Sequence, residues 1–513
     1  MAKRRRVFAG FVLAGVLGCG SAGSDPTAGV VRFVPGPCAV ELPAGQDPAD
    51  VTCGTVTVPE QRQGFDGRTL ELAVVVLRAT GDDPAPDPVV FLSGGPGDSA
   101  LGGALRNWTA EFAAPLQSRR DLVFFDQRGT GYSRPLLGCP EYVQATRDQL
   151  AEDLNASEDG RRGVAALLAC RERLLAEGVR LDAYSSAATA ADVGDLMHAL
   201  GYASWNLRGI SYGARVALTA LRDAPDGVRS VILDSPVPPQ VNFQADFGSS
   251  FGRALDVLFE RCADDAACSR AYPDLRGTLA TLVARLDESP LVLAPVDSGS
   301  GQQLPLVVNG DRLLLGLQQA LYSSELIPVL PFAIARVAAG ETFLLEQLAA
   351  DVTVRNGFVA WGQHYSVFCA EETPFLTADV LEDAARGAAP RLFAIGLGLN
   401  VEPSREVCAS WGVPAPAAIE NEVVRSRVPG LVLSGEHDPV SPPGYAAATA
   451  SGLETAYVFE LPGYGHGVLP RRGPEGDRPG CAQGIIAQFL DAPQTPPDAS
   501  CIAQIPPVRF VGA

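Results

Sequence analysis

The sequence predicts an α/β protein in which a mostly parallel central sheet is flanked by helices and interrupted by a helical insertion. Three observations predict this class. Short apolar runs bounded by turn residues recur along the chain, as they do for strands that are buried on both faces of a sheet. Segments with helical spacing alternate with these runs. Between residues 238 and 404 helical segments continue with few strand signals, which indicates an inserted helical cap.

The first part of the sheet domain is expected at 38–237. An alternating pattern around three consecutive valines predicts a strand at 70–78. A helix is expected at 187–200 because its apolar spacing ends at Gly201, a typical C-cap signal. The same criteria predict an Ala-rich helix that ends near residue 222, and strands at 89–92, 122–126, 205–208 and 231–234.

The same criteria predict the helical cap at 238–404 and the final part of the sheet domain at 405–513. Short apolar runs that predict strands return after the cap, and a helix is predicted after the last of them. The expected cap helices are 251–264, 275–286, 311–320, 328–338 and 377–386, and the final part is expected to hold strands at 430–435 and 456–461 and a helix at 481–490.

The N-terminus resembles a secretory signal peptide. Basic residues at 3–6 precede an apolar stretch at 7–17, too short to span a bilayer but suited to an export signal. The sequence at 16–19 ends in Cys19 and resembles a bacterial lipobox, although Leu17 is bulkier than the usual residue there. We therefore expect a signal peptide at 1–18 and a linker at 19–37. The protein is expected to be secreted, or anchored as a lipoprotein through Cys19 in a bacterial cell envelope.

The cysteines fit an exported protein. Of the 11 cysteines, ten remain when Cys19 is set aside, and an even number in an exported chain indicates disulfides. Sequence alone does not determine the connectivity. Pairing between neighbours is the hypothesis: 38 with 53, 139 with 170, 262 with 268, 369 with 408, and 481 with 501. A zinc site is not expected, because the cysteine spacings do not match one and there are only four histidines.

Composition and charge exclude several classes of protein. With 513 residues and 47% hydrophobic content, the chain can bury a large core, so a small disulfide scaffold or a disordered tail is excluded. The formal net charge of −19 would repel a phosphate backbone, which argues against nucleic acid as a partner and favours cationic ones.

A serine nucleophile is predicted at Ser211. Residues 209–213 match G-x-S-x-G, and they stand between the strand at 205–208 and the following helix, which is the context this motif requires. Small residues two positions before and after the serine let strand and helix close in. The turn would project the Ser211 hydroxyl out of the sheet at the start of a helix.

The serine needs a base, and only four histidines are available. His466 lies in a glycine-rich loop after the last predicted strand, where this architecture places its base. His198 is expected to be structural within a helix, and His437 is expected to be an ordinary loop histidine. His364 falls within the cap, where it could line a pocket.

The third member of a triad must hold the imidazole in one tautomer. Asp438 follows the strand at 430–435 and precedes His466, which gives the order serine, acid, histidine. Glu436 is the rival acid.

An oxyanion hole needs two backbone N–H groups, and the residue after the nucleophile, Tyr212, is expected to supply one. The second is expected from the glycine-rich loop at 93–97, directly after the strand at 89–92. Gly95 is the first candidate and Gly94 the second, because glycine lets the backbone approach a substrate oxygen closely.

These motifs together resemble the α/β-hydrolase aminopeptidases of the proline iminopeptidase and tripeptidyl aminopeptidase type, and more closely the secreted tripeptidyl branch. The resemblance runs from about Cys38 to Cys501. It implies an α/β-hydrolase fold with a helical cap. The segments that carry it are 58–60, 66–69, Gly-Gly-Pro-Gly at 94–97, Asp-Gln-Arg-Gly at 126–129 with 130–133, the Ser211 turn, 435–439 and 465–467.

The resemblance also implies roles for other residues. Asp126 and Arg128 are expected to be structural, fixing loops under the site by ion pairing. Members of this family hold the substrate's ammonium with acidic cap residues, and Glu371 and Glu372 are the candidates here. Two positions depart from the family pattern, namely Ser93 before the glycines and Ile210 in the turn. Neither supplies catalytic chemistry, so the departures bear on substrate preference.

The sequence therefore predicts an exported serine hydrolase that cleaves amide bonds near the free N-terminus of peptides, releasing tripeptides or single residues without a metal or cofactor. A carboxylesterase or lipase with the same triad is the first alternative, because a triad does not encode the leaving group. A non-catalytic binding protein on the same fold is the second alternative. It is disfavoured because both Ser211 and His466 are present.

Overall fold

The computed structural model describes residues 29–43, 45–105, 115–296, 301–343, 345–346, 358–468 and 480–512. The predicted signal peptide and Cys19 lie outside these residues. Among the helices within these ranges, none combines the length and apolar character needed to cross a membrane.

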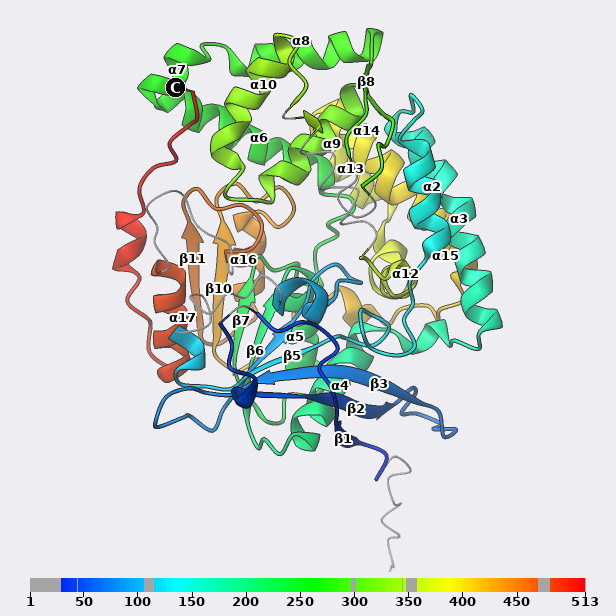
Figure 1. Ribbon diagram of the computed structural model, residues 1–513, viewed down its shortest axis with the longest axis vertical. Coiled ribbons are helices and arrows are strands. Elements are labelled where there is room, and N and C mark those ends of the chain that lie inside the picture. Colours follow the sequence, from blue (N-terminus) through cyan, green and yellow to red (C-terminus); the bar gives the residue numbers. More distant parts are fainter. Residues whose placement is uncertain are drawn as a thin grey trace, which may run out of the picture.

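A single nine-stranded sheet forms the centre of the lower half of the molecule in Figure 1. Strands β1, β2, β3 and β5 pair antiparallel, and all other neighbours pair parallel. This confirms the predicted, mostly parallel sheet. In spatial order the strands are β1 (Arg32–Pro35), β2 (Val51–Pro59), β3 (Thr69–Leu77), β5 (Leu122–Phe125), β4 (Val89–Leu92), β6 (Trp205–Ile210), β7 (Val228–Asp234), β10 (Gly430–Gly435) and β11 (Ala456–Leu461).

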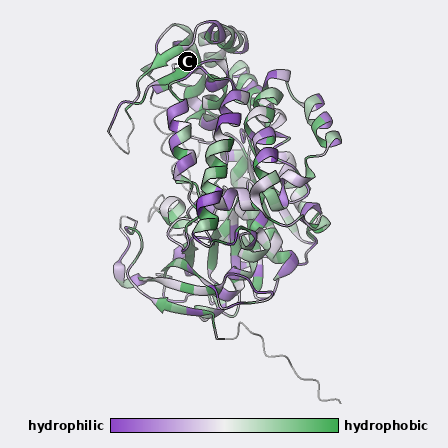
Figure 2. Cartoon of the chain, turned by 90° about the vertical axis from the view of Figure 1, so that its right-hand side faces the viewer, coloured by the Kyte–Doolittle hydropathy of each residue, from purple (hydrophilic) through white to green (hydrophobic). Residues whose placement is uncertain are grey.

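Both faces of the sheet are covered, which explains the continuous apolar runs. Val74 and Val76 of β3 join the core on one face, whereas Val75 and Leu77 join the core on the other. The first core also contains residues of α3 (Ala156–Ala176), α4 (Ser186–Ala199), α5 (Tyr212–Asp223) and α16 (Pro443–Ala450), and the second contains α17 (Cys481–Asp491). Figure 2 shows hydrophobic residues concentrated in the strands and hydrophilic residues along the outer helices.

A helical cap lies over one end of the strands and has a hydrophobic core of its own (Figure 1). The five cap helices predicted from sequence are present within a few residues of their expected bounds. The boundary predicted at 404 falls inside α15, so the helical run continues past it. The cap elements are α6 (Phe247–Asp264), α7 (Ala266–Ala271), α8 (Leu275–Glu288), the hairpin β8 (Leu291–Leu293) and β9 (Leu306–Val308), α9 (Gly310–Leu321), α10 (Leu330–Ala338), α12 (Trp361–Glu371), α13 (Ala378–Gly387), α14 (Pro390–Gly396) and α15 (Glu402–Trp411).

Two further segments connect the cap with the rest of the chain. Helix α3 packs against both α2 (Pro140–Gln149) and α15 on the right of Figure 1, although α2 and α3 precede the cap in sequence. After α17 the chain climbs to the cap, where Val508 and Phe510 join the cap's core. There the Val511 amide donates a hydrogen bond to the Pro328 carbonyl (3.0 Å).

The five disulfides join the neighbours that the sequence predicted. They are Cys38–Cys53, Cys139–Cys170, Cys262–Cys268, Cys369–Cys408 and Cys481–Cys501. The fourth ties α12 to α15 within the cap, and the fifth ties α17 to the start of the tail that climbs to the cap.

Because a disulfide stabilises mainly by restricting the unfolded chain, its contribution should follow the length of the loop it closes. Replacing both cysteines of Cys369–Cys408, which are 39 residues apart, by alanine should lower the free energy of unfolding by about 4 kcal/mol. The same change at Cys262–Cys268, only 6 residues apart, should cost about 2 kcal/mol. Urea unfolding of both double variants measures this, and equal losses would contradict it.

Candidate active site

Ser211 occupies a sharp turn between strand β6 and helix α5. Its backbone has φ 56° and ψ −120°, a left-handed value of φ that few non-glycine residues adopt. Glycines make the turn possible. A Cβ on Gly209 would lie 2.2 Å from the carbonyl oxygen of Gly213, and a Cβ on Gly213 would lie 2.1 Å from that of Leu92. The strained turn expected from the G-x-S-x-G pattern is therefore present.

Asp438 and His466 form a buried hydrogen-bonded pair. Oδ2 of Asp438 lies 2.9 Å from Nδ1 of His466, while Oδ1 accepts hydrogen bonds from the amides of Val440 and Ser441 at 2.9 and 2.8 Å. Because an ionised carboxylate can only accept, Nδ1 of the ring carries the proton. Nε2 is then left with a lone pair, the form that a general base requires.

The end of strand β7 brings the Ser211 turn and the His466 loop to one place. The carbonyl of Asp234 accepts a hydrogen bond from the Ser211 amide (3.0 Å), and its Oδ1 accepts one from the Val468 amide (2.9 Å). Tyr322, which follows α9 of the cap, packs edge-on against the His466 ring at 4.9 Å. Within the described residues no hydrogen bond joins the Ser211 hydroxyl to His466, and such bonds often tighten only when substrate is present.

The glycine-rich loop after β4 lies against the serine. A Cβ on Gly94 would be 3.2 Å from Cβ and 3.8 Å from Oγ of Ser211. Gly95 is exposed and has φ 106°, and a Cβ there would meet the Gly97 amide nitrogen at 2.6 Å. Tyr212 is the first residue of α5, as expected. Both predicted oxyanion donors thus belong to segments beside Ser211, and their role stays a prediction.

Asp126 fixes the segment that follows this loop, but by hydrogen bonds rather than by the ion pairing that the sequence suggested. Its carboxylate accepts from the Ser99 hydroxyl (2.9 Å), the Leu101 amide (3.0 Å) and the Tyr132 amide (2.7 Å). Burial raises the pKa of Asp126, and these hydrogen bonds oppose that shift. The expectation of ion pairing was wrong here because backbone donors, which sequence does not reveal, satisfy the carboxylate.

Arg128 does form the expected ion pair. Its guanidinium donates two hydrogen bonds, of 2.7 and 2.6 Å, to the carboxylate of Asp192 in α4. It also donates to the carbonyls of Ala183 and Glu60. Arg62 contacts the same carboxylate at 2.7 Å. The network joins α4 to the chain beneath the site, and removing one partner of such a buried pair is strongly destabilising.

Glu436, the rival acid, has other partners. Its carboxylate accepts from Nε of Arg261 in α6 (2.7 Å) and from the Gly463 amide (2.8 Å). A second arginine of α6, Arg253, donates to the backbone carbonyls of Glu436 (2.8 Å) and Asp438 (3.1 Å). Sequence analysis missed Arg253, because nothing local marks a cap arginine that folds onto a loop almost two hundred residues later.

The other histidines differ in their surroundings. His437 is fully buried; burial lowers its pKa to about 4, and its amide donates to the Tyr464 carbonyl at 2.8 Å. His198 is exposed on α4, edge-on to Trp205. His364 lies on α12 of the cap beside the glycine-rich loop.

Glu371 and Glu372 lie buried at the end of α12. The Glu371 carboxylate accepts from the Ser186 amide (2.6 Å) and hydroxyl, and that hydroxyl is 2.9 Å from the Tyr212 phenol. Glu372 forms an ion pair with Arg215 of α5 that lacks hydrogen-bond geometry. Burial raises the pKa of each carboxyl to about 7. Their binding of a substrate ammonium stays a prediction.

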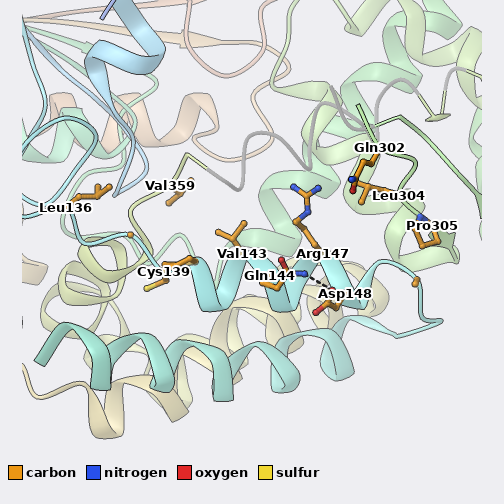
Figure 3. Close-up of a pocket in the computed structure, with 13 residues that line it drawn as sticks. Leu136, Cys139, Val143, Gln144, Arg147, Asp148, Gln302, Leu304, Pro305 and Val359 are labelled. Carbon is orange, nitrogen blue, oxygen red and sulfur yellow. Dashed lines mark hydrogen bonds between the residues drawn. The ribbon is translucent and has the colours of Figure 1, made fainter. Parts of the chain in front are cut away.

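A cavity of about 740 Å³ lies between α2, the β8–β9 hairpin and the segment that leads into α12 (Figure 3). It adjoins the glycine-rich loop through Val359, whose Cγ1 would lie 3.0 Å from a Cβ on Gly97. In Figure 3 Val143 and Arg147 point up from α2 toward it. Its lining comprises Leu136, Gly138, Cys139, Pro140, Val143, Gln144, Arg147, Asp148, Ala151, Gln302, Leu304, Pro305 and Val359.

No group of three or more histidine, cysteine, aspartate or glutamate side chains in the described part of the chain is arranged to hold a metal ion.

Comparison with known proteins gives two family matches. Residues 87–259 match the family described as alpha/beta hydrolase fold, and residues 397–501 match the family described as TAP-like protein. The first match spans the glycine-rich loop and Ser211, and the second spans Asp438 and His466.

Three relatives are similar over most of their length. The serine protease Hip1 of Mycobacterium tuberculosis is 25% identical over 90% of this chain and 89% of its own. The tripeptidyl aminopeptidase of Streptomyces lividans is 26% identical over 77% of this chain and 74% of its own. Carboxylesterase B of Mycobacterium tuberculosis is 28% identical over 76% of each chain. Because the sheet, the serine turn and both family matches agree, the chain is an enzyme of the α/β-hydrolase family, related to serine peptidases.

Proposed function

We propose that Ser211, His466 and Asp438 form a catalytic triad. The observation that carries this proposal is the 2.9 Å contact between Asp438 and Nδ1 of His466, which leaves Nε2 available as a base. The left-handed turn at Ser211, held by Asp234 together with the His466 loop, supports it.

In the proposed mechanism Oγ of Ser211 attacks the substrate carbonyl as Nε2 of His466 takes its proton. The resulting oxyanion is held by the amides of Tyr212 and Gly95. His466 then protonates the leaving amine, and an acyl-enzyme remains. Water, deprotonated by His466, attacks the ester and releases the acid, which regenerates Ser211.

The substrates proposed are peptides with a free N-terminus. The names of two relatives, a serine protease and a tripeptidyl aminopeptidase, support amide cleavage. The cluster at Glu371 and Glu372 supports recognition of a cation, because two buried carboxyls face a single guanidinium, that of Arg215. A substrate ammonium would supply the missing positive charge.

We also propose export, with the chain secreted or anchored through Cys19 in a bacterial cell envelope. Five disulfides support an oxidising compartment. The basic and apolar leader supports the same route.

A carboxylesterase is the second candidate function, favoured by the relative named carboxylesterase B. The proposed triad and oxyanion hole would serve an ester equally well, since the alcohol leaving group needs less help from the general acid than an amine does.

Replacing Ser211 by alanine should remove the attacking oxygen and lower kcat by roughly 10⁶-fold for every substrate, without changing the melting temperature. The measurement is a peptide-library digest read by mass spectrometry, with free and acetylated N-termini in parallel, together with fluorophosphonate labelling of the intact protein. We expect cleavage of free-amine peptides and labelling that disappears in Ser211→Ala. Activity that survives in this variant would refute the triad, whereas faster turnover of short acyl esters than of tripeptidyl amides would favour the esterase.

Replacing Glu371 by glutamine should raise KM for free-amine peptides by about ten- to a hundredfold, because a hydrogen bond to a charged group contributes about 1.5–3 kcal/mol. KM for N-blocked esters should stay the same, which is the internal control. Glu372→Gln is the less suitable change, since it also removes the charge opposite Arg215.

The two carboxyls should also give KM a pH dependence. Burial holds the pKa of each at about 7, so they take up protons as pH falls through that value and lose attraction for an ammonium. KM for free-amine peptides should therefore rise below pH 7 in the unmodified enzyme. Equal effects of Glu371→Gln on free and blocked substrates would exclude the amine-binding role.

A further inference from the structure

The start of α12 in the cap holds the middle of the glycine-rich loop at two successive carbonyls. The Ala360 amide donates a hydrogen bond to the Gly97 carbonyl (2.9 Å), and Nδ1 of His364 lies 2.9 Å from the Pro96 carbonyl. The approach is close, since a Cβ on Gly97 would lie 3.0 Å from the carbonyl oxygen of Ala360. The loop is thus in direct contact with the cap.

The His364 ring is set to donate. A carbonyl oxygen can only accept, so Nδ1 of His364 carries the proton. Burial lowers the pKa of the ring to about 4, which keeps it neutral at ordinary pH. Its orientation is fixed by aromatic neighbours, with ring centroids 4.0 Å from Phe368, 4.9 Å from Trp361 and 5.3 Å from Tyr365.

The loop needs this restraint because its own sequence supplies little. Gly95 and Gly97 both have φ 106°, and glycine leaves such a backbone free to move to other conformations. The preceding end of the loop is held by Gln127, whose amide donates to the Ser93 carbonyl (2.9 Å). The following end is held by Asp126 through the Ser99 hydroxyl. Between these two ends the Asp98 amide donates to the Gly94 carbonyl (3.4 Å), and the cap contributes the two contacts at Pro96 and Gly97.

We propose that His364 is a positioning residue for the oxyanion hole. Its Nδ1–H fixes the Pro96 carbonyl, two peptide units after the Gly95 amide, and thereby restrains the short stretch of backbone that carries this amide. In the proposed mechanism the Gly95 amide stabilises the oxyanion formed next to Ser211. The cap then belongs to the catalytic apparatus as well as covering the substrate. This inference rests on the proposed function, because a loop of this kind matters to the rate only if an oxyanion forms there.

The test compares three replacements of His364 in the full chain. Asparagine places an amide N–H near the position of Nδ1, glutamine places one nearer the position of Nε2, and leucine keeps the bulk but has no donor. We expect His364→Leu and His364→Gln to lower kcat by roughly 10- to 100-fold, less than the loss of an oxyanion donor itself, with KM within about twofold. His364→Asn should recover most of the rate.

A second measurement separates positioning from a general effect on folding. Affinity for a peptide boronic acid, which forms a tetrahedral adduct with the serine, should fall in the leucine and glutamine variants by the same factor as kcat/KM. Melting temperatures of all variants are measured alongside. His198→Asn is the matched control, since that histidine is exposed on α4, and its kinetics should be unchanged.

Failure of this inference is distinguishable from failure of the proposed function. If Ser211→Ala is inactive and His364→Leu keeps full kcat, His364 does not position the hole. Equal losses in the asparagine and leucine variants, or a rise in KM with kcat unchanged, would overturn the inference as well. Should the leucine variant fail to fold, the asparagine and glutamine pair decides alone, because both retain a polar amide and differ in where it lies.

Discussion

The close approach of three backbones at the Ser211 turn is the constraint on which the site depends. Strand β6, helix α5 and the end of β4 come so near one another that neither Gly209 nor Gly213 has room for a side chain. This contact forces the residue between them into a left-handed conformation and holds the glycine-rich loop beside it. Asp234, at the end of the neighbouring strand β7, then ties the serine turn to the histidine loop. The arrangement is thus a property of the packed sheet edge rather than of any one loop.

The sequence predicted the elements whose signal is local. The strands at 89–92 and 205–208, the five neighbouring disulfide pairs and the turn at Ser211 all follow from patterns within a few dozen residues. Strands β1 and β2 were missed, because β1 is a mostly exposed edge strand and β2 contains Gly54, so neither shows a continuous apolar run. The β8–β9 hairpin was missed because its strands are only three residues long.

The partners of the candidate site residues were beyond sequence analysis for a different reason. A motif identifies a functional side chain but carries no information on what lies opposite it after folding. Arg253 on the carbonyl of Asp438 and Ser186 on Glu371 are contacts between segments more than 180 residues apart. Burial of charge had to be observed as well, since the raised pKa of Glu371 follows from its burial in the folded protein and not from its neighbours in the chain.

The carboxyl-terminal tail gives the cap an attachment besides its two chain boundaries and its contacts with the sheet domain. An inserted domain is normally joined to the rest of the protein by two connecting segments, one at each of its boundaries. These two connections alone would let the domain swing as a hinged lid. Here residues 508–511 add to the cap's core and bond to Pro328, while the Cys481–Cys501 bridge anchors the start of the tail to α17. A swinging motion of the cap would have to break these contacts, so the tail restrains the cap against rotation about its two boundaries.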